Sequence, residues 1–174
     1  MATYSSDKPQ PAGRVLQVVN GVQKTFASTT SSTPAATGLE VTITPSSTSS
    51  KVLIIMSIGI SSTQDDYGYI KLYRVIGGSA TEITGVNSTQ SSNANNVNAW
   101  RHYGHRDGDA SYEVSDLSGN YLDSPSSTSA ITYKVYWANT YSDQMVTAQP
   151  YTVDTGNTYT NMFSNQITAM EISG

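Results

Sequence analysis

The stretch of sequence that decides the fold is Lys51–Ile60, which reads KVLIIMSIGI. Every residue from Val52 to Met56 is apolar, so a strand built from them carries apolar side chains on both faces. A buried helix is the competing interpretation, but the β-branched content and the length of about ten residues favour a strand. We therefore expect a central strand that is covered on both faces, with Ser57 and Gly59 relieving crowding at its end.

Segments on either side of this stretch alternate between apolar and polar residues with a period of two, as half-buried strands do. The alternation is clearest at 39–44 and at 130–138. The apolar members of these two segments are Leu39, Val41, Ile43, Ile131, Tyr133, Val135 and Trp137. Each segment is therefore predicted to turn one face toward a core.

Glycine-containing pairs predict two hairpin turns. Asn20-Gly21 would join strands at 14–19 and 22–28, because Asn-Gly is the strongest two-residue hairpin signal. Gly77-Gly78 would join a strand at 67–76 to one at 79–84. Further strands are expected at 100–103, 116–122, 144–149 and 166–172.

The number of short strands predicts the fold class. No window places apolar residues at helical spacing between start and stop signals. Roughly nine to eleven short strands are typical of an all-β protein with two antiparallel layers. We expect one antiparallel β-sandwich, jelly-roll-like, over residues 14–174, preceded by a short extended N-terminal arm at residues 1–13.

Composition excludes several classes of function. Charged residues make up 13% of the 174 residues and the net charge is −4, whereas nucleic-acid binding depends on clustered Lys and Arg. The chain has no cysteine, which excludes disulfides, thiolate zinc sites and a thiol nucleophile. No apolar run approaches the roughly 20 residues of a membrane helix. We expect neither a nucleic-acid partner nor membrane insertion.

His102 and His105 form the one cluster that is typical of a metal site. Residues three apart on a strand face opposite ways, and the flanking Arg101 and Arg106 would repel a cation. We therefore expect no metal and no cofactor, with a zinc or calcium site through nearby acidic residues as the alternative. No Gly-x-Ser-x-Gly elbow is present, and these two histidines are the only bases for a triad, so we expect no enzyme.

The aromatic residues are mostly tyrosine, with 12 Tyr against 2 Trp and 2 Phe. Tyr and Trp are enriched at contact surfaces because they combine an apolar ring with a polar group. Two interpretations stay open: packing between subunits or over the sandwich ends, and a platform in loops 85–99 and 139–161 that stacks on sugar rings. The candidate contact residues are Trp100, His102, Tyr103, His105, Tyr141, Tyr151 and Tyr159.

Three segments carry a resemblance to a known group of proteins. They are 41–54 (VTITPSSTSSKVLI), 122–135 (LDSPSSTSAITYKV) and 167–172 (ITAMEI), in that order along the chain. Together they resemble a β-rich module of tail fibres and other virion appendages of tailed phages, especially those of cyanobacteria and marine bacteria. The resemblance covers roughly residues 14–174.

The resemblance implies a β-sandwich that is usually trimeric, enzymatically inert and often used to touch the host surface. Many such fibres have a long N-terminal shaft, whereas here the module starts about 13 residues after Met1. This departure favours a short knob or fibre whose arm docks on a capsid, neck or tail protein.

We therefore expect a non-enzymatic virion structural protein: a homotrimeric short fibre, knob or capsid-decorating cement protein. It would be assembled in the bacterial host cytoplasm and exposed on the particle surface. A receptor-binding fibre tip that recognises a host surface polysaccharide is the second hypothesis, and a glycan-cleaving enzyme is the third.

Overall fold

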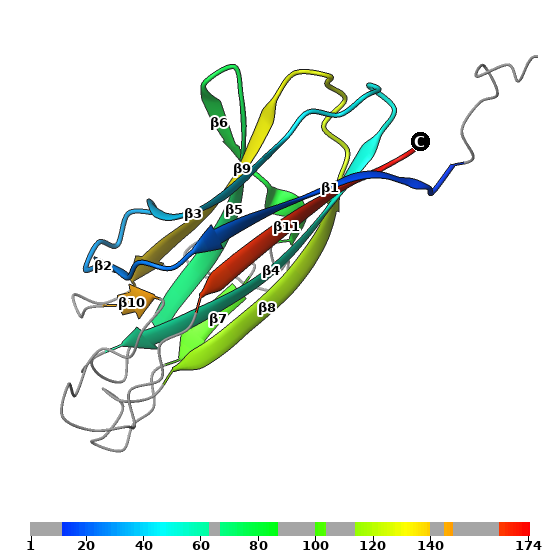
Figure 1. The fold of residues 1–174 in the computed structure, drawn as a ribbon. Helices are drawn as coiled ribbons and strands as arrows, with labels where there is room; N and C mark the ends of the chain where they lie inside the picture. The colour runs from blue at the N-terminus through cyan, green and yellow to red at the C-terminus, as the bar shows by residue number, and fades with distance from the viewer. Residues whose placement is uncertain (1–11, 63–66, 87–99, 104–113, 140–144, 148–163) are drawn as a thin grey trace, which may run out of the picture.

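A computed structural model describes residues 12–62, 67–86, 100–103, 114–139, 145–147 and 164–174; for 62, 67, 86, 100–103 and 145–147 it describes the backbone alone. The described residues form strands and one short 3-10 turn, η1 (Thr84–Val86) (Figure 1). The strands are β1 (Val15–Gln23), β2 (Ala27–Thr29), β3 (Ala35–Ile43), β4 (Lys51–Ser62), β5 (Tyr67–Ile76), β6 (Ser79–Glu82), β7 (Trp100–Tyr103), β8 (Ser115–Asp123), β9 (Ile131–Asn139), β10 (Met145–Thr147) and β11 (Asn165–Ile172).

The first sheet is built around β4. β11 pairs with Lys51–Ser57 and β10 pairs with Ile60–Ser62, so these two strands follow one another along the same edge of β4. β1 pairs with β11 and β2 pairs with β10, while β8 pairs with the opposite edge of β4. The sheet therefore has four rows: β1 with β2, β11 with β10, β4, and β8.

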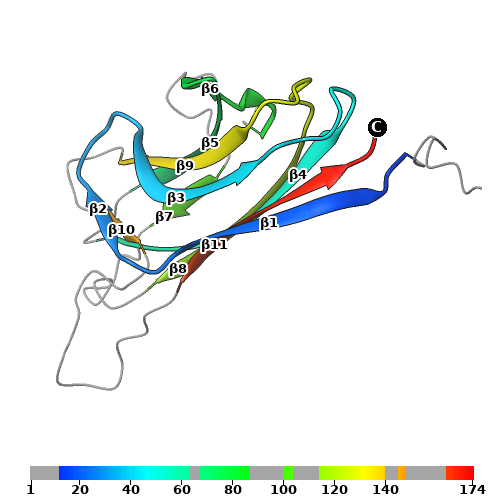
Figure 2. The ribbon, with the colours of Figure 1, turned by 45° about the horizontal axis from the view of Figure 1, so that its top comes forward.

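The second sheet is built in the same way around β9 and β5. β9 pairs with β3 on one edge and with β5 on the other. β7 and β6 follow one another along the far edge of β5. All the pairings in both sheets are antiparallel, and the two sheets lie as separate layers (Figure 2). The expected antiparallel β-sandwich is confirmed.

The core lies between the two layers. Alternate residues of the central strands point inward, and burying each large aliphatic side chain stabilises the fold by about 1.5–3 kcal/mol. The predicted inward positions at 39–43 and 131–137 are all buried. The other buried apolar residues include Val52, Ile54, Met56, Ile58, Ile60, Ile70, Leu72, Ile83, Ile167 and Ala169.

β4 occupies the central position that the sequence predicts, because it has partners along both edges. Its inward residue Ile54 is 1% exposed, but its neighbour Ile55 is 42% exposed. The expectation that both faces of this strand are covered is therefore wrong for a single chain. Among the described residues, only those of the second sheet pack as a layer against β4, and none forms a layer over the outer face of the first sheet.

The hairpin predicted at Asn20-Gly21 is also wrong, because β1 runs straight through this pair. Gly21 lies opposite Ile167 of β11, and a Cβ atom built on it would overlap the backbone carbonyl of Glu40 in β3. The glycine thus permits the close approach of two edge strands from different sheets. The turn at Gly77-Gly78 is confirmed, with φ of 58° and 82° at the two glycines.

Candidate interaction surfaces

The structure places three of the predicted contact residues on one strand. Trp100, His102 and Tyr103 belong to β7, whose backbone pairs with the first half of β5. Their side chains are not among the described ones. His105, Tyr141, Tyr151 and Tyr159 lie outside the described residues, so contact through these residues stays a prediction.

The strand ends that flank these residues share one end of the sandwich. Tyr67, at the start of β5, pairs with Tyr103, at the end of β7, and the next residue of β5 pairs with Asn139, at the end of β9. In the other layer, Ser115 at the start of β8 pairs with Ile60 near the end of β4. We call this the loop end of the sandwich.

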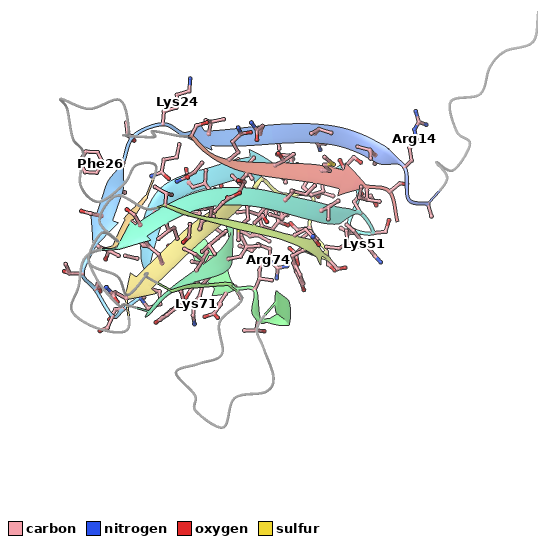
Figure 3. All side chains as sticks on the ribbon, turned by 90° about the horizontal axis from the view of Figure 1, so that it is seen from below. Arg14, Lys24, Phe26, Lys51, Lys71 and Arg74 are labelled. Carbon is pink, nitrogen blue, oxygen red and sulfur yellow. The ribbon has the colours of Figure 1, made fainter. Side chains whose placement is uncertain are left out.

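The described chain termini meet at the opposite end. The Gly13 amide donates to the Ser173 carbonyl at 2.8 Å, and the Ser173 amide donates to the Arg14 carbonyl at 2.8 Å. Arg14 and Lys51 are labelled at this same end of the first sheet in Figure 3. We call it the terminal end.

Two loops at the terminal end carry the same five residues, PSSTS, at 45–49 and at 125–129. The first connects β3 to β4 and the second connects β8 to β9, so each crosses from one sheet to the other. Pro45 and Pro125 are both buried. The repeated pentapeptide is therefore a sequence signal for equivalent inter-sheet loops.

Glu171 fastens the first of these loops to the sheet. The residue is 1% exposed. It accepts hydrogen bonds from the Ser46 amide (2.7 Å), the Ser46 hydroxyl (2.6 Å), the Ser50 hydroxyl (2.7 Å) and Gln17 Nε2 (2.7 Å). Burial acts to raise the pKa of Glu171, but the hydrogen bonds from Ser46, Gln17 and Ser50 outweigh it and lower the pKa to about 2.

Asp123 fastens the start of the second loop. Arg74 Nη1 donates to both of its carboxylate oxygens at 2.9 Å, and the Tyr133 hydroxyl donates to Oδ2 at 2.8 Å. Burial first, and then the hydrogen bond to Asp123, raises the pKa of Tyr133. The cluster ties β8 of the first sheet to β5 and β9 of the second.

These two buried carboxylates are occupied by protein donors, so we assign them structural roles at the terminal end. Among the residues that the structure describes, no group of three His, Cys, Asp or Glu side chains is placed to hold a metal ion. The side chains of His102 and His105 are not described, so the absence of a metal there stays a prediction. Within the same described ranges, no helix is long and apolar enough to cross a membrane.

The outer face of the second sheet is a surface of paired charges. Lys134 Nζ lies 2.7 Å from Glu40 Oε2, and Lys71 Nζ lies 2.9 Å from Glu82 Oε2. Between these pairs, the rings of Tyr73 and Tyr136 contact each other with centroids 4.2 Å apart. Such a face is compatible with water, because charged side chains are well hydrated.

The outer face of the first sheet is different, and we call it the apolar face. One row of paired residues crosses all four strand rows: Val18, Met170, Leu53 and Leu122. The end residues Val18 and Leu122 are 55% and 46% exposed. One level further along β4, Ile55 adds to the same face. The sequence predicts a covered strand at 51–60, so the exposure of Ile55 on this face was not expected.

A scan against protein-family models finds no match to this chain, and a search of curated proteins finds none either.

Proposed function

We propose that this chain is a non-enzymatic structural protein of a tailed-phage particle: a short trimeric fibre, knob or capsid-decorating cement protein. It would be assembled in the bacterial host cytoplasm and displayed on the particle surface. Its arm, residues 1–13, would dock on a capsid, neck or tail protein.

One observation carries this proposal. The three segments that resemble phage appendage modules contain the residues that fasten the terminal end. Ser46 and Ser50 lie in the first segment, Asp123 in the second and Glu171 in the third. The segments that carry the resemblance therefore include side chains with defined contacts at the terminal end.

The order of the strand rows supports the same proposal. Eight strand rows follow one another along the chain: β1 with β2, β3, β4, β5, β6 with β7, β8, β9, and β10 with β11. When these rows are numbered one to eight, their order across the first sheet is 1-8-3-6 and across the second sheet 2-7-4-5. We take this order to be that of a jelly roll, an architecture found in viral capsid proteins and in lectins.

Mass spectrometry of purified phage particles tests the proposal. We expect peptides of this chain in particles that have been washed in high salt and banded on a gradient, at a constant ratio to the major capsid protein. Cryo-electron microscopy of the same particles would then show its position. Recovery of the chain from the soluble lysate alone, with none in the particles, would overturn the proposal.

A receptor-binding role is the second candidate, and the loop end favours it. The candidate contact residues are carried by, or lie between, strands whose described ends meet there. The test is a host-polysaccharide array probed with the purified chain and with Tyr151→Ala and Tyr159→Ala variants. We expect binding that the variants weaken without release of reducing sugar. Release of reducing sugar would favour the glycan-cleaving enzyme instead.

A further inference from the structure

The sequence of β4 predicts that both faces of the strand are covered, whereas the structure of the single chain covers one face. Apolar residues occupy both of its faces, as expected for a strand between two layers. In the structure the second sheet covers only the inner face, which leaves Leu53 half-buried and Ile55 exposed. Something other than this chain's described residues is needed to complete the outer layer.

The apolar face is centred on the row at the level of Leu53, which spans about 14 Å across the four strand rows. Ile55 adjoins this row on β4, where its neighbours on the same face are Thr168 and Asn120. Val15 and Ile172 lie next to each other at its edge and extend it toward the terminal end.

The charges on the two outer faces indicate which partner fits. On the apolar face, the charged residues of the described strands are Lys51 at one end and Asp116 at the other, with none between them. A copy of the chain can therefore lie on this face without bringing like charges together at its centre. The outer face of the second sheet carries two ion pairs, Lys71 with Glu82 and Lys134 with Glu40, and burying them in a contact would cost their desolvation.

The position of the apolar row indicates how the copies are oriented. The row lies at the level of Leu53, nearer to the terminal end of the sheet. An antiparallel arrangement places the row against itself when it is centred on Leu53, but centred on Ile55 it places the row against the polar level of Ser57, Ser118 and Gln166. An axis parallel to the strands places each row against the same row of the neighbouring copy. Lys51 lies at the edge, where its ammonium group reaches water.

We infer that the apolar face is the contact between copies of this chain, with the first sheets of neighbouring copies packed around an axis parallel to their strands. This inference rests on the trimer of the proposed function and specifies which surface forms it. The second sheets, with their ion pairs, then face the solvent.

Substitutions at exposed positions test the contact without disturbing the core. Ile55→Lys and Leu122→Lys each place a charge on the apolar face, and Thr42→Lys places the same charge on the exposed outer face of the second sheet. By light scattering of the full chain, we expect three chain masses for the wild type and for Thr42→Lys. We expect one chain mass for the other two variants, with wild-type far-ultraviolet circular dichroism.

Cross-linking provides a second measurement that does not depend on breaking the assembly. The chain has no cysteine, so one engineered cysteine reports one position. On oxidation, Ile55→Cys should form a disulfide-linked pair on a non-reducing gel, and Thr42→Cys should not. Equal cross-linking at both positions, or a trimer that survives both lysine substitutions, would place the contact elsewhere and overturn the inference. A monomeric wild type would also overturn it.

The outcomes for the surface and for the particle are read separately. A trimer that is unaffected by the apolar-face variants refutes the inference and leaves the virion proposal standing. Absence of the chain from purified particles refutes the virion proposal, even where Ile55→Cys cross-links as expected.

Discussion

Glu171 shows how much of a buried polar contact a sequence can indicate. It follows Ile167 and Ala169 at a spacing of two, so it occupies an inward position of an alternating strand. A carboxylate there is a signal for a buried polar contact, because a buried charge requires hydrogen-bonding partners. The sequence could not name the donors, since Gln17 and Ser46 come from elements 154 and 125 residues away.

The lowered pKa of Glu171 makes stability depend on pH. Its pKa is about 2 in the folded chain, against 4.5 for an ordinary glutamate, so its contribution is present above pH 4.5 and is lost as the pH falls toward 2. The loss amounts to about 3 kcal/mol in total. Urea unfolding between pH 7 and pH 2.5 should show this slope, and Glu171→Gln should flatten it.

Glu40→Gln is the matched control for this experiment, because Glu40 is an exposed partner in a surface ion pair. Surface pairs contribute about 0–1 kcal/mol, so this variant should keep the wild-type slope. An identical slope in Glu171→Gln and the wild type would show that Glu171 does not carry the pH dependence.

β1 and β4 show which properties of a strand can be predicted. Both were predicted to be extended, β4 from its β-branched content and length and β1 as two strands at 14–19 and 22–28, because these are local properties of the sequence. The Asn20-Gly21 pair was misleading, since an approach to Glu40 of another strand and a hairpin both require glycine. Likewise, the apolar content of β4 could not say whether its second layer comes from the same chain or from a neighbour.

The two faces of β4 should respond differently to truncation. Ile54→Ala leaves a cavity in the core and should destabilise the chain by about 2–5 kcal/mol at any protein concentration. Ile55→Ala should instead weaken assembly, so its effect on the urea midpoint should change with protein concentration. Denaturation at two concentrations separates these cases, and equal, concentration-independent losses would mean that both residues are core.

The fold class of the whole molecule could be predicted from the sequence, but the pairing of its strands could not. The number of short alternating segments predicts two antiparallel layers, and the structure has them. Which strands are neighbours depends on contacts far apart in sequence, such as β1 with β11 and β3 with β9. The candidate contact residues of the loop end could be proposed from their type, but their geometry remains a prediction.

Deletion of residues 1–13 tests the role of the arm. We expect the truncated chain to form the trimer, because the apolar face is retained, and to be missing from particles assembled in cells that express it. Deletion of residues 1–11 is a useful companion, because it keeps the hydrogen bond from Gly13 to Ser173. Mass spectrometry of particles and light scattering measure the two effects, and normal incorporation of both truncations would refute an attachment role.

The separation of the terminal end from the loop end gives the molecule a polarity. β4 has 12 residues and runs most of the way between these ends, which corresponds to about 40 Å. A chain held on a particle through the segment before Gly13 would therefore stand on its terminal end, with the Ser46–Ser50 loop facing the particle. The loop end would point away from the particle. Sequence variation there would change the surface that the particle exposes without changing how the chain is attached to it.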